Sequence, residues 1–176
     1  GKKGQMSVLS SETCALEMIG AEFVREVAPG EMVVCHQDGT VTSRQIFPAR
    51  ERARPCVFEM IYFSRPNSFI EGDCVHEIRK SLGRQLAIEA PVEADIVSPI
   101  PDGGIPGAMG YAQQTGHAYD MALIRGHYAG RTFIQPTQEL RELGVNKKFS
   151  ANKGVVEGKR VVLIDDSIVR GTTSRN

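Results

Sequence analysis

Two neighbouring carboxylates, Asp165 and Asp166, directly follow the apolar run VVLI at residues 161–164. Adjacent unpaired carboxylates are costly to bury, so we expect them to meet a metal ion, hydroxyl donors or basic groups. A polar segment bent by a glycine comes next, and its members are Ser167, Arg170, Gly171, Thr172, Thr173 and Ser174. Glycine permits a tight turn with inward-pointing N–H groups, and the hydroxyls add further donors. This pattern is typical of a cradle for a phosphate monoester.

The two acids suit the hydroxyls of a ribose, bound directly or through Mg²⁺, so the segment predicts a site for a ribose phosphate. It is not a Walker loop, because no G-x-x-x-x-G-K-[ST] is present, and it is not a Rossmann fingerprint, because the acids precede the glycine. The alternative is a structural strand-to-helix turn capped by Asp and Ser. Capping needs one polar side chain, however, rather than two acids and four hydroxyls.

A central parallel strand is the element that would position the two acids. In open α/β sheets, ligands gather at the carboxyl ends of the strands, where Asp165 and Asp166 fall. The other strand candidates are residues 56–63, 94–101 and 121–124. The helix candidates are residues 107–116 and a stretch capped by Asp73, in which Val75, Ile78, Leu82 and Leu86 share one face. This alternation predicts an α/β fold with a parallel sheet flanked by helices.

The first 46 residues have a different, β-rich pattern. A short helix is expected within residues 10–20, and Gln37-Asp38-Gly39 between two apolar runs predicts a hairpin. Residues 47–55 contain prolines and arginines and are interpreted as a linker. Residues 126–154 carry little periodic apolar character, which favours a moving loop over regular structure.

The composition restricts the class of protein. The 176 residues are 41% apolar and carry 21 basic and 21 acidic side chains, so there is no broad field for nucleic acid or anionic lipid. No apolar run approaches the roughly 20 residues of a membrane span, and no signal peptide is visible at the start. The four cysteines have no C-x-x-C spacing and indicate reduced thiols of the cytoplasm. The absence of a starting Met leads us to expect a fragment of a longer protein.

Four segments resemble the type I phosphoribosyltransferases, and among them the amidophosphoribosyltransferase family. They are CVFEMIYFSRPNSFIEG, EAPVEADIVSPIPDGG, GRTFIQPTQELRELGV and EGKRVVLIDDSIVRGTTSR. The resemblance implies an enzyme that binds 5-phosphoribosyl-1-pyrophosphate (PRPP). In this family, ammonia from glutamine attacks C1 of PRPP, pyrophosphate leaves, and 5-phosphoribosylamine forms in the first committed step of purine (IMP) biosynthesis.

The same resemblance implies a domain division. Residues 1–46 would be the C-terminal remnant of a glutaminase domain of the N-terminal-nucleophile type, without its active site. Residues 47–55 would be the linker, and residues 56–176 a phosphoribosyltransferase domain lacking its end. The resemblance further implies a homo-oligomer, and the balanced charge and the cysteine pattern predict a cytoplasmic protein that binds neither nucleic acid nor membrane.

The resemblance also assigns roles to residues. Asp165 and Asp166 would bind the ribose and Mg²⁺, while Ser167 and residues 170–174 would hold the 5-phosphate. The residues expected to meet pyrophosphate are Asp102, Gly103 and Gly104. The catalytic residues, expected on a loop that folds over PRPP, are Arg125, Tyr128 and Arg131.

Four positions differ from the usual family pattern or leave their role open. Arg125 and His127 stand where Lys and Arg are usual, and Gly103 stands where many members carry Ser or Thr, which removes one oxygen near the metal. Cys56 matches a ligand of the [4Fe–4S] cluster of some members, but members without a cluster also have Cys here and one Cys cannot hold a cluster, so a plain core thiol is favoured over a ligand. Two alternative functions remain: a regulatory protein that binds PRPP without chemistry, and another type I phosphoribosyltransferase.

Overall fold

The computed structural model describes residues 1–48, 56–126 and 149–168. The chain divides into two compact units, Gly1–His76 and Glu77–Asn176, and each is described by itself. Among the described residues, no helix has the length and apolar character needed to cross a bilayer.

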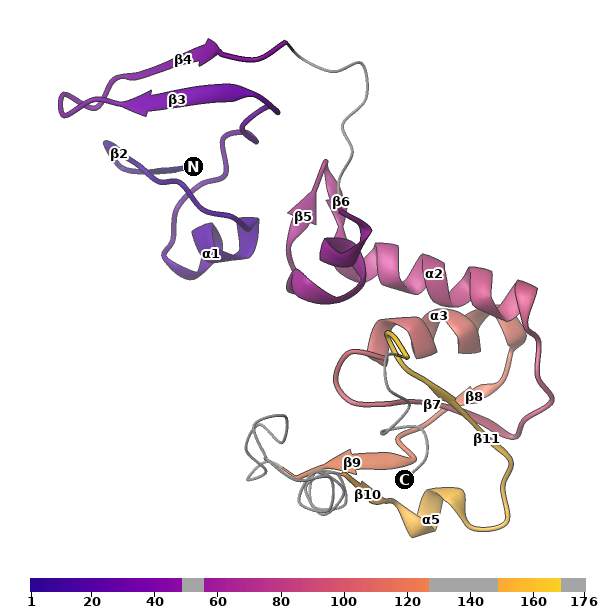
Figure 1. Cartoon of the computed structure of the whole chain (residues 1–176). Helices are drawn as coiled ribbons and strands as arrows, with labels where there is room; N and C mark the ends of the chain where they lie inside the picture. Colours follow the sequence, from indigo (N-terminus) through magenta and orange to yellow (C-terminus); the bar gives the residue numbers. More distant parts are fainter. Residues whose placement is uncertain (49–55, 127–148, 169–176) are drawn as a thin grey trace, which may run out of the picture. The chain divides into compact units, whose positions relative to one another are not determined.

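The start of the first unit contains the predicted helix and hairpin (Figure 1). The short strands β1 (Lys2–Lys3) and β2 (Met6–Ser7) pair before α1 (Thr13–Met18). The antiparallel strands β3 (Glu31–Cys35) and β4 (Val41–Gln45) follow. The Asp38 carboxylate accepts a hydrogen bond from the backbone N–H of Thr40 at 2.9 Å, and Gly39 has a φ of 85°. The Asp-Gly turn therefore forms the hairpin as predicted.

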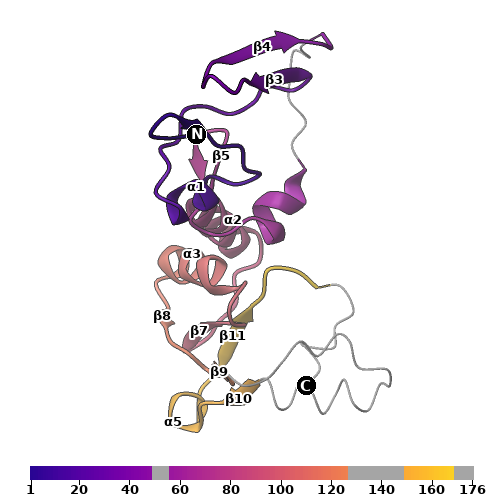
Figure 2. The same ribbon diagram turned by 90° about the vertical axis from the view of Figure 1, so that its left-hand side faces the viewer.

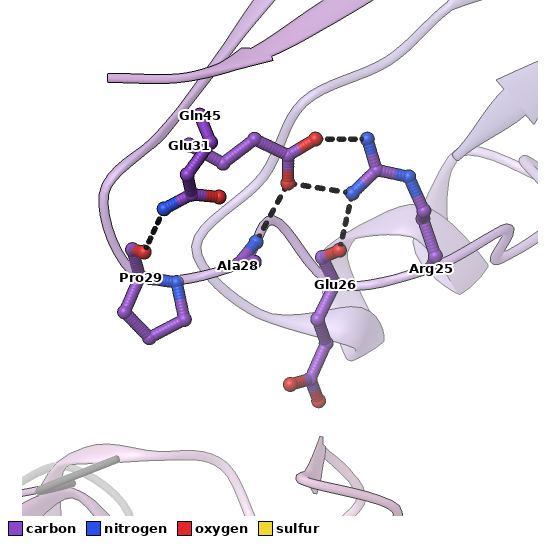
Figure 3. A network of polar contacts seen from close by, with 6 residues as sticks. All are labelled: Arg25, Glu26, Ala28, Pro29, Glu31 and Gln45. Carbon is purple, nitrogen blue, oxygen red and sulfur yellow. Dashed lines mark hydrogen bonds and ion pairs between the residues drawn. The ribbon is translucent and has the colours of Figure 1, made fainter. Parts of the chain in front are cut away.

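A polar network joins this hairpin to the segment before it (Figure 3). The Arg25 guanidinium donates to both carboxylate oxygens of Glu31, at 2.8 and 2.6 Å, and the N–H of Ala28 donates to the same carboxylate at 2.8 Å. The bonds from the Arg25 side chain, and after them the bond from the N–H of Ala28, lower the pKa of Glu31 to about 2. The Gln45 amide donates to the Pro29 carbonyl at 2.8 Å, so the base of the hairpin is fixed on both strands.

The prediction of a strand at residues 56–63 is wrong. This segment is helical, and its second part is the π-helix η1 (Glu59–Phe63), in which the N–H of Ser64 bonds the Glu59 carbonyl at 3.0 Å. The ring centroid of Phe58 lies 5.3 Å from that of Tyr62 and 5.0 Å from that of Phe63. Spacings of four and five residues place these rings on one helical face, and this packing outweighs their preference for strands.

The rest of the first unit is bound to its beginning by side chains. The strands β5 (Phe69–Ile70) and β6 (Asp73–Cys74) form a small hairpin. The Glu12 carboxylate accepts bonds from the N–H of Arg65 at 2.8 Å and from the Ser68 hydroxyl at 2.7 Å. Residues 56–76 therefore pack with the N-terminal segment in one compact unit. Most of the predicted linker, residues 49–55, lies outside the described residues, and the predicted domain boundaries stay predictions.

A three-stranded parallel sheet forms the centre of the second unit. It contains β7 (Ile96–Pro99), β8 (Ala118–Tyr119) and β11 (Val161–Ile164), in the order β11-β7-β8. Figure 2 shows the same strands from a second direction. Every residue of β7 is buried, as expected for the central strand of a parallel sheet. The predicted α/β fold with a parallel sheet is confirmed. The short strand β8, which has polar neighbours, was not predicted from the sequence.

Two helices cover this sheet as successive layers. The helix α3 (Ile105–Thr115) contacts all three strands, and α2 (Val75–Glu89) packs on α3. A Cβ atom on Gly83 would lie 1.9 Å from the Gly107 carbonyl oxygen, and one on Gly110 would lie 1.9 Å from that of Lys80. The two backbones approach so closely because glycines line the crossing. The hydrophobic core that these two helices form with β7 and β11 contains Ala87, Val97, Ala108, Tyr111, Ala112 and Ile164.

This close crossing corrects the predicted face of α2. Val75 is buried as expected, but Leu82 and Leu86 are 47% and 41% exposed. The buried positions are instead Arg79, Gly83 and Ala87. A helix that must approach its neighbour's backbone turns its small residues inward, and the leucines are left outside. Asp73 lies in β6, two residues before the helix begins, rather than at the cap position expected for it.

An antiparallel pair completes the second unit. The strand β9 (Leu123–Arg125) pairs with β10 (Phe149–Ala151), and a single turn of helix, α5 (Lys153–Val156), follows. The strand expected at residues 121–124 is therefore present, though it pairs outside the parallel sheet. Of the segment 126–154, which was expected to lack regular structure, residues 127–148 lie outside the described residues. The expectation is wrong for residues 149–151, which form β10 by pairing with β9.

Candidate functional site

The carboxyl ends of β7 and β11 lie together at one edge of the parallel sheet. Pro99 pairs with Ile164 in the register of these strands, and the N–H of Ile100 bonds the Ile164 carbonyl at 2.8 Å. The loop after β7 therefore starts beside the residues that follow β11. This arrangement brings two of the predicted ligand-binding segments, separated by about 60 residues of sequence, to one place.

The loop of residues 101–104 is fixed against β11 by Gly104. The N–H of Gly104 bonds the Ile100 carbonyl at 3.0 Å, and α3 begins at the next residue. A Cβ atom on Gly104 would lie only 2.1 Å from the carbonyl oxygen of Ile164. The loop can thus sit on the strand only because this residue has no side chain. The peptide bond between Pro101 and Asp102 is cis.

The two acids occupy the adjacent turn and are half-buried. Asp165 accepts a hydrogen bond from the backbone N–H of Asp166 at 2.9 Å, and Asp166 accepts one from the Ser167 hydroxyl at 2.7 Å. A Cβ atom on Gly103 would lie 1.8 Å from the second carboxylate oxygen of Asp166. The Asp166 carboxylate therefore rests directly against the loop of residues 101–104.

An ion pair adds a cation to this loop. Arg125, the last residue of β9, donates from its guanidinium to the Asp102 carboxylate. The side chains of Arg125 and Asp102 are 44% and 63% exposed, so the pair lies at the surface. One predicted catalytic residue thus contacts the loop predicted to meet pyrophosphate.

These contacts define the candidate site at the carboxyl edge of the sheet. The predicted residues that the structure brings together are Asp102, Gly103, Gly104, Arg125, Asp165, Asp166 and Ser167. The predicted residues that lie outside the described residues are Tyr128, Arg131, Arg170, Gly171, Thr172, Thr173 and Ser174, together with His127. Their roles stay predictions.

The oxygen donors of this edge fit a hard divalent cation. Asp165 and Asp166 supply carboxylate oxygens, and Ser167 supplies a hydroxyl. Within residues 1–48, 56–126 and 149–168 there is no group of three or more His, Cys, Asp or Glu side chains that could hold a metal. Mg²⁺ is usually bound through one or two carboxylates plus substrate phosphates and water, so two acids suffice for such a site.

Cys56 lies in the first unit and is exposed. It lines a cavity of about 420 Å³ that also includes Glu12, Glu59 and Ser68. Both interpretations of this residue, a cluster ligand and a plain thiol, stay open.

Sequence reasoning missed Ser98, which supports the site from within the sheet. This residue of β7 is fully buried, and its hydroxyl accepts a hydrogen bond from the N–H of Ala122 at 2.8 Å. The bond fixes the chain just before β9, the strand that carries Arg125. The signal for it was a hydroxyl in the middle of the apolar run IVSPI, since a buried polar group needs a partner.

Sequence reasoning also missed an ion pair at the opposite edge of the sheet. The Asp95 carboxylate accepts bonds from the backbone N–H of Arg160 at 2.7 Å and from the Arg160 guanidinium at 3.0 Å. The bond from the Arg160 side chain, and after it the bond from the backbone N–H, lowers the pKa of Asp95 to about 2. Because Asp95 precedes β7 and Arg160 precedes β11, the pair fixes the amino ends of the two strands.

Comparison with known proteins gives a consistent result. The chain is 54% identical over 175 residues to the amidophosphoribosyltransferase of Bacillus subtilis, covering 99% of this chain and 36% of that protein. It is 52% identical over 170 residues to the amidophosphoribosyltransferase of Rhizobium etli, covering 95% of this chain and 34% of that protein. No protein-family model matches the chain.

A solved structure agrees with these relatives. It is the glutamine PRPP amidotransferase of B. subtilis complexed with ADP and GMP, which matches this chain with a TM-score of 0.82 at 55% identity. The match covers 94% of this chain and 36% of that one. This chain is thus a homologue of the amidophosphoribosyltransferases and spans about a third of their length.

Proposed function

We propose that the natural protein carrying this sequence is an amidophosphoribosyltransferase, which forms 5-phosphoribosylamine from PRPP and ammonia derived from glutamine, as a step of purine biosynthesis. The observation that carries this proposal is the contact of the Asp166 carboxylate with Gly103 at the carboxyl ends of β7 and β11. It joins a pair of acids suited to a ribose with a loop suited to a pyrophosphate.

The ligand would lie across this edge of the sheet. Asp165 and Asp166 would accept hydrogen bonds from the two ribose hydroxyls, and residues 102–104 would face the pyrophosphate. Arg125 already contacts this loop through Asp102 and so supplies positive charge where the pyrophosphate is expected. Mg²⁺, when bound by the two acids and the ligand, would withdraw charge from the leaving group.

The chemistry asks for little proton transfer, because ammonia is itself a good nucleophile. The barrier lies in the positive charge that develops at C1 and in the negative charge that collects on the departing pyrophosphate. Groups positioned before the reaction stabilise such charge best, and removing one typically costs about 3 to 4 kcal/mol. The guanidinium of Arg125 and the backbone N–H of Gly103 are the described groups that fit this role, whereas the N–H of Gly104 already bonds the Ile100 carbonyl.

Residues 1–46, within the first unit, would correspond to the end of a glutaminase domain of the N-terminal-nucleophile type. The B. subtilis relative aligns with 99% of the chain, which extends the similarity across this unit. In this proposal the glutaminase domain of the whole protein supplies the glutamine-derived ammonia. A homo-oligomer and a [4Fe–4S] cluster that uses Cys56 are further properties proposed for the whole protein.

The proposal is tested by measuring pyrophosphate release from PRPP with ammonia as the nitrogen donor, in the natural protein that carries this sequence. We expect Asp165→Asn and Asp166→Asn each to lower this activity at least tenfold. Asp38→Asn, in the turn of the β3–β4 hairpin, is the matched control and should keep it. Wild-type activity in both site variants would refute the proposed site, and absence of the reaction in the unaltered protein would refute the function.

A further inference from the structure

The ion pair between Arg125 and Asp102 places a negative charge inside a site that is expected to bind a strongly negative ligand. Asp102 belongs to the loop of residues 101–104, and Arg125 reaches it from the end of β9. The next loop residue, Gly103, touches the Asp166 carboxylate. The pair therefore stands at the point where a diphosphate would approach the loop.

The carboxylate of Asp102 imitates the ligand chemically. A guanidinium binds carboxylate and phosphate oxygens through the same planar set of donors. Only one guanidinium nitrogen of Arg125, Nη1, bonds Asp102, and both side chains are substantially exposed. Exposed ion pairs of this kind are weak and are exchanged easily. A diphosphate offers more charge and more oxygens than the carboxylate, so it would displace the carboxylate from the guanidinium.

The pair at the other edge of the sheet is similarly exposed, with the Arg160 and Asp95 side chains 63% and 43% exposed, but its carboxylate has a second donor. There the Asp95 carboxylate is held by the guanidinium and also by the backbone N–H of Arg160. No backbone N–H among the described residues donates to the Asp102 carboxylate. The Asp102 contact thus depends on the guanidinium, and it ends when the guanidinium turns to another anion.

We propose that Asp102 is a positioning residue that holds Arg125 in the ligand-free protein and that the diphosphate group of the ligand displaces it. The inference rests on the proposed function, since it concerns the diphosphate part of the same site. Asp102 sets the affinity of the site: it keeps the guanidinium at the loop and competes with the ligand for it.

The test measures binding of inorganic pyrophosphate in the presence of Mg²⁺, by titration calorimetry on the natural protein that carries this sequence. Asp102→Asn removes the competing carboxylate, and we expect pyrophosphate to bind about threefold more tightly, the scale of an exposed ion pair. Glu93→Gln, which removes one exposed negative charge before β7, is the control and should leave the affinity unchanged.

A double-mutant cycle separates the release of Arg125 from the simple loss of a negative charge. We expect Arg125→Gln to weaken pyrophosphate binding, and Asp102→Asn added to it to give little further gain. An equal gain with and without Arg125 would overturn the inference, as would unchanged or weaker binding by Asp102→Asn alone.

Kinetics with PRPP and ammonia give a second readout, in which Asp102→Asn should lower the KM for PRPP with little change in kcat. A purely structural role of Asp102 would not lower the KM. If the unaltered protein binds pyrophosphate but the variants behave otherwise than expected, only this inference fails. If the unaltered protein binds neither pyrophosphate nor PRPP, the proposed function fails with it.

Discussion

The two edges of the parallel sheet carry the same pair of residue types but use them differently. At the amino ends of β7 and β11, the Asp95 carboxylate binds both the backbone and the side chain of Arg160. At the carboxyl ends, Asp102 binds only the exposed guanidinium of Arg125. The first contact joins two strands, whereas the second leaves a cation available. Whether such an ion pair joins strands or leaves its cation available is therefore judged from the backbone hydrogen bonds at the same carboxylate, rather than from the two residue types.

The largest effect is expected where the carboxyl edge is most crowded. Gly104→Ala would place a Cβ atom 2.1 Å from the Ile164 carbonyl oxygen, which also accepts a hydrogen bond from the N–H of Ile100. We expect the free energy of unfolding to fall by about 3 kcal/mol, as for overpacked cores. Urea denaturation of the chain measures it.

The matched control for this variant is Gly154→Ala, whose Cβ atom would meet nothing closer than 3.9 Å. It should leave the stability unchanged or raise it slightly, because Ala favours the helix α5. Equal stability of the two alanine variants would contradict the close contact at Gly104.

A smaller loss is expected from the bond that supports Arg125. Ser98→Ala leaves the N–H of Ala122 without its partner, and a buried unpaired donor costs about 1 to 3 kcal/mol. Ser150→Ala, at an exposed position of β10, is the control for urea denaturation. If Ser98→Ala were as stable as this control, the hydroxyl would not support the carboxyl edge.

Substitutions of Gly103 test two sets of oxygen atoms separately: those of the Asp166 carboxylate and the hydroxyl that a serine would add. A Cβ atom there would displace the Asp166 carboxylate, whose end is flexible, so the fold should survive while the site changes. We expect Gly103→Ala to raise the KM for PRPP about threefold to tenfold, a smaller effect than loss of a whole charge-stabilising donor.

Gly103→Ser introduces the same crowding but adds a hydroxyl oxygen. It should recover part of the affinity at subsaturating Mg²⁺, which a titration of activity against Mg²⁺ would show. Identical behaviour of the Ala and Ser variants would mean that the added hydroxyl oxygen does not bind Mg²⁺.

The smallest effect concerns the amino edge and appears as a pH dependence. The pKa of Asp95 is lowered to about 2 from an ordinary value of 3.8, so its ion pair stabilises the fold above that ordinary value and is lost as the pH falls towards 2. The gap in urea midpoint between the wild type and Asp95→Asn should therefore be present at pH 6 and shrink near pH 2. A gap that stays constant over this range would contradict the ionic contact, and activity at pH 7 should be the same in both proteins.

The sequence was sufficient where an element's own pattern decides its structure. The continuous apolar run at β7 predicted a buried parallel strand, and the acids after β11 predicted a polar site at the strand ends. The prediction that β11 is central and buried on both faces is wrong among the described residues, because it lies at the edge of the order β11-β7-β8 and only its Ile164 is buried. The Asp-Gly turn likewise defined its hairpin. The roles of individual site residues came instead from the resemblance to a family.

The sequence was insufficient where a neighbour decides. The inward face of α2 follows from the approach of Gly107 and Gly110, which no periodicity within α2 reveals. The aromatic segment at residues 56–63 has strand-forming residue types at a helical spacing, and ring packing selects the helix. The contact of Arg125 with Asp102 depends on the pairing of β9, which brings together residues 23 positions apart.

The parallel pairing of β7 with β11 also bears on the order in which the molecule assembles. Their first partners, Ile96 and Val161, are far apart in the sequence, whereas β7, α3 and β8 are consecutive. Pairing strands that are distant in the sequence costs loop-closure entropy before the contacts between them are gained, so such pairings tend to form late. On a ribosome, β7, α3 and β8 would associate first, and the candidate site would form only when β11 emerges. A nascent chain would thus gain its shape well before its capacity to bind.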